Sequence, residues 1–177
     1  RKMADALDPE VGARARSRIT AGLAVLLSLL ALLSGWFWRS LFGGEIPALA
    51  SVSHGVAWSA LTLFVLWRFR DKLMQNTASR QLAITAMWLV IGGLFIRLLS
   101  AIGGIPFYDA FPLEFAFYAV TIGLMGYNRR PRFDFAAAPM CVGAIAIAIW
   151  PTWLFEWTAG TVFLTLSTMA IVWHPRF

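Results

Sequence analysis

The sequence contains few of the side chains that most reaction chemistry requires, with one cysteine, two histidines and two lysines. Cys141 lies in an apolar run, so the chain forms no internal disulfide and offers no pair of thiols to a metal. Lys2 and Lys72 lie outside the apolar runs, which excludes a lysine-bound retinal within a membrane span. His54 and His174 are predicted near opposite membrane faces, which excludes a haem held by both.

Charge is also scarce. Charged residues make up 14% of the chain, against about 25% in an ordinary soluble domain. Hydrophobic residues make up 59%, and the mean hydropathy is +0.70. The net charge of +6 comes from residues that punctuate apolar runs, a pattern typical of membrane proteins and not of a nucleic-acid-binding face. No nucleic-acid partner is therefore predicted.

The motifs of common enzymes are missing as well. The sequence has no P-loop, no GxSxG and no HExxH. It also offers no convergent set of acid, base and nucleophile within the apolar runs. We therefore predict no enzymatic activity in this chain.

The sequence does contain six apolar runs. A helix of about 20 residues spans the roughly 30 Å hydrocarbon core of a bilayer. The predicted fold is an all-α integral membrane protein, a bundle of six transmembrane helices in contact with the lipid bilayer. The runs are Ile19–Trp38, Ile46–Trp67, Leu82–Ile105, Pro112–Tyr127, Phe135–Trp150 and Thr152–Trp173.

These runs divide the chain into three parts. Residues 1–18 are a cytoplasmic N-terminal segment, residues 19–173 are the transmembrane domain, and residues 174–177 are a cytoplasmic tail. Asp8, Pro9 and Glu10 have the pattern of an N-cap, a first-turn proline and a first-turn acid. We expect a pre-helix that begins near Pro9 and continues into the first span.

Basic residues predict the orientation. Thirteen of the fifteen lysines and arginines fall in the N-terminal segment, the second and fourth loops and the tail, and only Arg39 and Arg97 lie toward the other side. Such loops are cytoplasmic by the positive-inside rule. We predict cytoplasmic termini and a multi-pass protein of the inner membrane, and the preference for arginine over lysine indicates a GC-rich bacterial genome.

A weak internal repeat suggests how the helices pair. Gly35–Arg39 followed by Gly43-Gly44 resembles Gly93–Arg97 followed by Gly103-Gly104. Each block ends an odd-numbered helix and precedes the next helix, which favours three antiparallel hairpins in chain order. Chance similarity between two glycine-rich turns is the alternative.

Five polar residues are candidates for a site: Arg97, Glu114, His54, Arg39 and Glu156. An ionisable side chain within a membrane is costly and is therefore a functional candidate. Arg39 closes the first run, and Glu114 and Glu156 fall in the first turns of their predicted helices. The helix dipole alone stabilises charges at these ends, so these three residues have a purely structural alternative.

Arg97 and His54 lie deeper than helix ends. Apolar residues continue past Arg97, and His54 is roughly 10 Å along its helix from Pro47. Glu114 opens the helix expected beside that of Arg97. We predict one polar cluster of Arg97, Glu114 and His54 in the external third of the bundle, with Arg39 and Glu156 at its rim.

The role of this cluster is open between two readings. One reading is a structural clamp between Arg97 and Glu114, with His54 as a hydrogen-bonded packing residue. A ligand site is the other, and an arginine there would suit a carboxylate or an anionic headgroup. No cofactor is predicted, although some of the aromatic residues at this end could line a pocket for a lipid, quinone or pigment; the others form an interfacial belt.

Three functions are compatible with these features. We favour a membrane-embedded sensor or anchoring module of a bacterial signalling protein, with a protein partner or fused cytoplasmic domain providing the output. A non-catalytic accessory subunit that scaffolds a pigment- or quinone-containing complex is an alternative. A small-solute transporter component is another, although such proteins usually have broken helices and polar groups at mid-membrane.

Overall fold

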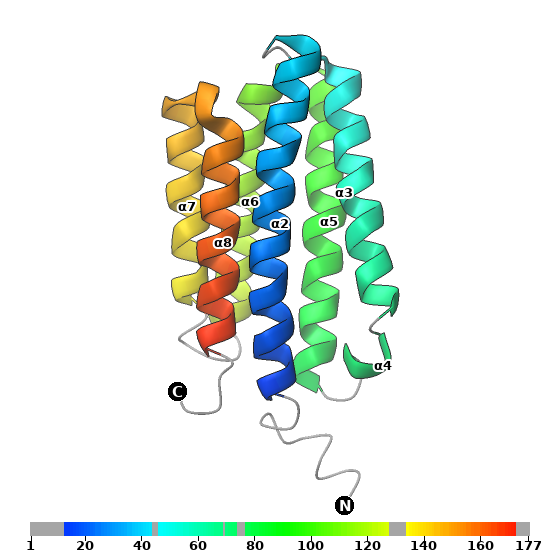
Figure 1. Ribbon diagram of the computed structural model, residues 1–177, viewed down its shortest axis with the longest axis vertical. Coiled ribbons are helices and arrows are strands. Elements are labelled where there is room, and N and C mark those ends of the chain that lie inside the picture. Colours follow the sequence, from blue (N-terminus) through cyan, green and yellow to red (C-terminus); the bar gives the residue numbers. More distant parts are fainter. Residues whose placement is uncertain (1–12, 44–45, 69, 74–76, 128–133, 173–177) are drawn as a thin grey trace, which may run out of the picture.

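The computed structural model describes residues 13–43, 46–68, 70–73, 77–127 and 134–172, and these contain helices and no strand. The helices run roughly parallel along one bundle axis (Figure 1). The all-helical prediction is therefore confirmed. The elements are α2 (Ala13–Phe42), α3 (Ala48–Arg68), α4 (Arg70–Leu73), α5 (Thr77–Ile102), α6 (Phe107–Tyr127), α7 (Asp134–Ile149), the 3₁₀ turn η2 (Pro151–Trp153) and α8 (Leu154–Val172).

Four helical segments are long and apolar enough to cross a membrane: Ser17–Phe42, Ala50–Arg68, Ala83–Ile102 and Pro151–Val172. A fifth apolar helix, Phe135–Ile149, is shorter. The outward faces of the bundle carry many large apolar side chains, of which Ile102 and Trp36 are 75% and 71% exposed. Such faces suit lipid and not water. Together these features indicate a membrane protein.

The predicted start of the fourth helix is wrong. The sequence predicts a helix that begins at Pro112, but α6 begins five residues earlier at Phe107 and carries Pro112 inside it. Pro106 precedes the helix and accepts hydrogen bonds from the backbone N–H groups of Asp109 and Ala110. Pro112 is in the second turn of α6, where a proline has no N–H to donate to the carbonyl four residues earlier.

Glycine and proline define the neighbouring ends. Gly104 adopts a left-handed conformation with φ of 67°, and Ile105 N–H donates to the carbonyl of Ser100 at 2.9 Å, which ends α5. Pro151 ends α7 and opens η2, so α8 begins at Leu154, two residues after the predicted start. The expected pre-helix start at Pro9 and the tail 174–177 lie outside the described residues, and α2 is helical from Ala13.

The closely packed helix pairs form a sequence around the bundle. α2 packs on α8, α8 on α7, α7 on α6, α6 on α5, and α5 on α3. Two of the three expected hairpins, α5 with α6 and α7 with α8, are thus close pairs. The first is not: among the described residues, α2 and α3 are not a closely packed pair. α2 instead packs on α8, where a Cβ at Gly35 would lie only 2.5 Å from Cβ of Phe155.

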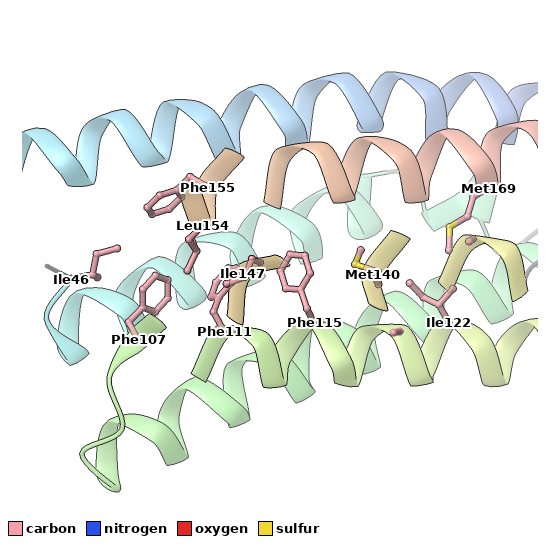
Figure 2. Packing of buried hydrophobic residues seen from close by; sticks show 12 residues of the cluster. Ile46, Phe107, Phe111, Phe115, Ile122, Met140, Ile147, Leu154, Phe155 and Met169 are labelled. Carbon is pink, nitrogen blue, oxygen red and sulfur yellow. The ribbon is translucent and has the colours of Figure 1, made fainter. Parts of the chain in front are cut away.

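The core changes in character along the bundle. Phenylalanines of α6 and α8 fill the end opposite to the start of α2, and Ile122, Met140 and Met169 fill the part nearer that start (Figure 2). Phe107, Phe111 and Phe115 recur every four residues on one face of α6, so they form a continuous aromatic stripe. This stripe forms one wall beside the polar residues described next.

Candidate ligand cavity and its buried ion pair

Arg97 of α5 and Glu114 of α6 form a buried ion pair. Arg97 Nε donates to Glu114 Oε2 at 2.7 Å, and Arg97 Nη2 donates to Glu114 Oε1 at 3.2 Å. The two residues are 6% and 3% exposed. Two parallel charge-assisted bonds fix the geometry and are the strongest form of such a pair. The expected partner of Arg97 is therefore in place.

Neighbouring residues make further contacts with both charged groups. Tyr118 O–H donates to Glu114 Oε1, and Arg97 Nη1 donates to the Ser51 carbonyl of α3 at 3.4 Å. The guanidinium carbon lies 4.9 Å from the ring centre of Phe111, a cation–π distance. Because Glu114 already takes two of its three nitrogens, Arg97 has little capacity left for a carboxylate or phosphate ligand. This argues against the anionic ligand considered above.

Two glycines make room for this pair. A Cβ at Gly55 of α3 would lie 2.8 Å from Cδ of Arg97, and one at Gly93 of α5 would lie 2.9 Å from Oε1 of Glu114. Contacts this short are not tolerated without movement. The polar side chains therefore pack directly on helix backbones, which is a common way to bring membrane helices together.

The helix-end explanation does not apply to Glu114. Because α6 begins at Phe107, Glu114 is two turns inside the helix, beyond the reach of the helix dipole. The explanation does suit the other two residues, since Arg39 lies in the last turn of α2 and Glu156 in the first turn of α8.

Arg39 and Glu156 form a second, separate ion pair. Arg39 Nη1 donates to Glu156 Oε1 at 2.6 Å, Nη2 donates to Oε2 at 2.7 Å, and Nη2 also donates to the Thr152 carbonyl at 2.8 Å. Their side chains are 41% and 34% exposed. The pair links α2 to α8 at the end of the bundle, a partnership the sequence analysis did not foresee.

His54 of α3 is hydrogen-bonded to its helical neighbour. Trp58 Nε1–H donates to His54 Nε2. An indole N–H is only a donor, so Nε2 is the acceptor and the proton of the neutral imidazole is on Nδ1. Nδ1 is buried and has no hydrogen-bond partner among the described residues. The ring also lies 6.0 Å from Trp38 of α2 and 6.4 Å from Phe155 of α8, between centres.

A cavity of about 180 Å³ brings these residues together at the centre of the bundle. Its wall includes Arg97, Glu114, Tyr118, His54 and Trp58, so the ion pair and the imidazole share one space. Arg39 and Glu156 are not part of the wall. Each of the six long helices contributes to it, for example through Ala31, Gly55, Leu94, Phe115, Met140 and Phe155.

Sequence reasoning missed two members of the site. Tyr118 and Trp58 lie four residues after Glu114 and His54, and residues four apart share a helix face. That spacing was available as a signal. In the part of the chain that the structure describes, no group of three or more His, Cys, Asp or Glu could hold a metal ion.

Comparison of the chain with protein-family models, with curated proteins and with solved structures gives no match.

Proposed function

We propose that this chain is a membrane-embedded sensor module that binds a small ligand in the central cavity and transmits its presence through α2. In this proposal the chain crosses the bacterial inner membrane six times with both termini cytoplasmic. The output belongs to a protein partner or a fused cytoplasmic domain, and this chain carries out no catalysis.

The observation that carries the proposal is the position of the cavity between α2 and the rest of the bundle. Ala31 and Leu27 of α2 line it opposite residues of α3, α5 and α6. α2 packs closely on α8 but not on α3. A molecule placed in this space therefore contacts a helix whose closely packed partner, among the described helices, is α8.

α2 also has the length to carry such a shift. It is 30 residues long and runs from the cavity to the end of the bundle where α5 begins and α8 ends (Figure 1). Packed interfaces respond to ligands by helix shifts of about 1–2 Å. A shift at Ala31 would reach the start of α2 because a continuous helix moves as a unit.

Electron–electron distance measurements in lipid nanodiscs test this proposal. Spin labels at Arg18→Cys on α2 and Arg80→Cys on α5, both exposed, report the position of α2 in a Cys141→Ala background. Benzene is the probe, because it fills an apolar cavity of about 150 Å³ without needing polar contacts. The distance is expected to change by about 1–2 Å on saturation.

A matched label pair and a blocked variant control the measurement. Ile84→Cys and Val120→Cys lie on the close pair α5 and α6 and should keep their distance. Ala31→Phe fills the cavity from α2, so the response to benzene should disappear. Benzene binding without any change between positions 18 and 80 would contradict a sensor and favour the accessory-subunit alternative.

A further inference from the structure

The chemistry of the cavity wall restricts which ligand the proposed sensor would take. Among the described residues, the charges that line the cavity belong to Arg97 and Glu114, and each neutralises the other through two hydrogen bonds. An anion in the cavity would be repelled by Glu114 as well as attracted by Arg97. A cation would likewise be repelled by Arg97 as well as attracted by Glu114. The wall thus favours an uncharged molecule.

The size and lining restrict it further. A cavity of about 150 Å³ with an apolar lining holds one benzene, so a cavity of about 180 Å³ holds a six-membered ring with a small substituent. Aromatic side chains surround the space, among them Phe111, Phe115, Phe155 and Trp58. Ring-on-ring contacts with edge or offset geometry stabilise an aromatic guest beyond the burial of its area.

His54 supplies the polar discrimination. Its Nε2 accepts from Trp58, so Nδ1–H is a donor, and this donor is buried without a partner among the residues described. A buried donor that lacks an acceptor is unfavourable, and providing one restores the lost hydrogen bond. The imidazole is part of the cavity wall, so an acceptor on a ligand in the cavity would lie close to this donor.

We infer that the cavity binds a neutral aromatic or quinoid ring with a carbonyl group, and that the carbonyl oxygen accepts a hydrogen bond from His54 Nδ1. This rests on the proposed function, because it names the ligand class of the same cavity. Lipid-soluble ring carbonyl compounds, such as quinone headgroups, belong to this class. In this proposal the molecule enters from lipid between α2 and α3, which are not a closely packed pair among the described residues.

Three small molecules of nearly equal shape separate the contributions. Acetophenone has a ring and a carbonyl, isopropylbenzene replaces the carbonyl oxygen with a methyl group, and benzoate replaces the methyl with a second, charged oxygen. Their equilibrium binding is measured to the full chain in nanodiscs, with protein-free nanodiscs subtracted. The measured quantity is the ratio of the Kd of isopropylbenzene to that of acetophenone, in wild type and in His54→Phe.

The ratio is expected to be about tenfold higher in wild type than in His54→Phe, the effect of one hydrogen bond to a buried donor. Comparing two proteins cancels the different partition of the probes into lipid. His54→Gln, which restores an N–H donor, should recover part of the preference. Thermal unfolding of each variant in the same nanodiscs verifies that it is folded.

The contrary results are distinct. An equal ratio in wild type and His54→Phe, or tightest binding of benzoate, would overturn the ligand class. Movement of α2 with no carbonyl preference would leave the sensor standing and remove this inference alone. A full carbonyl preference without movement of α2 would leave the ligand class standing and contradict the sensor. If none of the probes binds saturably, both the sensor and the ligand class are contradicted.

Discussion

The central feature at the scale of single residues is a charge pair that serves the fold as well as the cavity. Arg97 and Glu114 are buried, and each satisfies the other directly. Removing one partner of such a pair leaves an uncompensated buried charge, whereas removing both leaves an apolar gap. The loss of stability on changing both residues should therefore be smaller than the sum of the two single losses.

Single substitutions of the pair should be more harmful than the double substitution. Arg97→Leu or Glu114→Leu alone is expected to lower the free energy of unfolding by about 3–5 kcal/mol, and the double variant by less than either. Titration of the purified chain with a denaturing detergent measures these values. Additive losses in the double variant would contradict the pairing.

The second ion pair provides a matched control for that experiment. Arg39 and Glu156 have the same two-bond geometry, but their side chains are 41% and 34% exposed. Exposed pairs contribute about 0–1 kcal/mol. Arg39→Leu is therefore expected to lower the free energy of unfolding far less than Arg97→Leu. Because the two pairs share the same hydrogen-bond geometry, such a difference would show that burial causes the larger loss.

At the scale of helices, the packing of α2 on α8 includes a close approach at one glycine. Gly35 lies where the side chain of Phe155 meets α2, and a Cβ there would be 2.5 Å from Cβ of Phe155. Gly22, on the same helix, has no atom within 4 Å of an added Cβ. The two glycines thus differ in packing while sharing one helix.

Alanine at these two positions should have opposite effects on stability. Gly35→Ala is expected to destabilise the bundle by about 1–3 kcal/mol through overpacking. Gly22→Ala is expected to be neutral or to stabilise it by up to about 1 kcal/mol, because alanine favours helix over glycine. Detergent-induced unfolding compares the two, and equal effects would contradict the packing of α2 on α8.

The sequence predicts where the helices lie better than it predicts which helices pack together. Each of the six apolar runs falls on a helix, because long apolar runs leave few alternatives. Three of the runs match α3, α7 and α8 to within two residues at each end, whereas α2, α5 and α6 begin five or six residues before the predicted starts. The prediction that the fourth helix begins at Pro112 was wrong, because proline is common in a first turn and α6 instead carries it in the second turn. Glycine and proline at 103–106 did mark the turn before it correctly.

Helix partners are harder to infer than helices. Arg97 with Glu114 could be predicted because their helices are consecutive and antiparallel. Arg39 with Glu156 could not, because 117 positions separate them and only the packing of α2 on α8 brings them together. The cavity was also beyond prediction, since its wall takes residues from six helices that no local pattern relates.

At the scale of the whole molecule, the proposals require a particular placement in the membrane. Arg97 lies in the second half of α5, and Glu114 and His54 lie in the first halves of α6 and α3, which are the halves nearer the end of the bundle where α2 ends (Figure 1). Thirteen of the fifteen basic residues fall in sequence segments that the positive-inside rule predicts to be cytoplasmic, which include the segment before the first span. The cavity should therefore lie in the outer half of the bilayer, within reach of a lipid-soluble ligand.

The most direct measurement of this arrangement is thiol labelling of single cysteines with a membrane-impermeant maleimide on intact cells. The sites are Gly44, Asp109 and Thr152 at one end and Gln75 and Arg130 at the other, in a Cys141→Ala background. Labelling of the first three, with the last two labelled only after lysis, is the result that six spans with cytoplasmic termini predict. Labelling of a cysteine at position 130 on intact cells would contradict the orientation, and with it the outer-leaflet cavity.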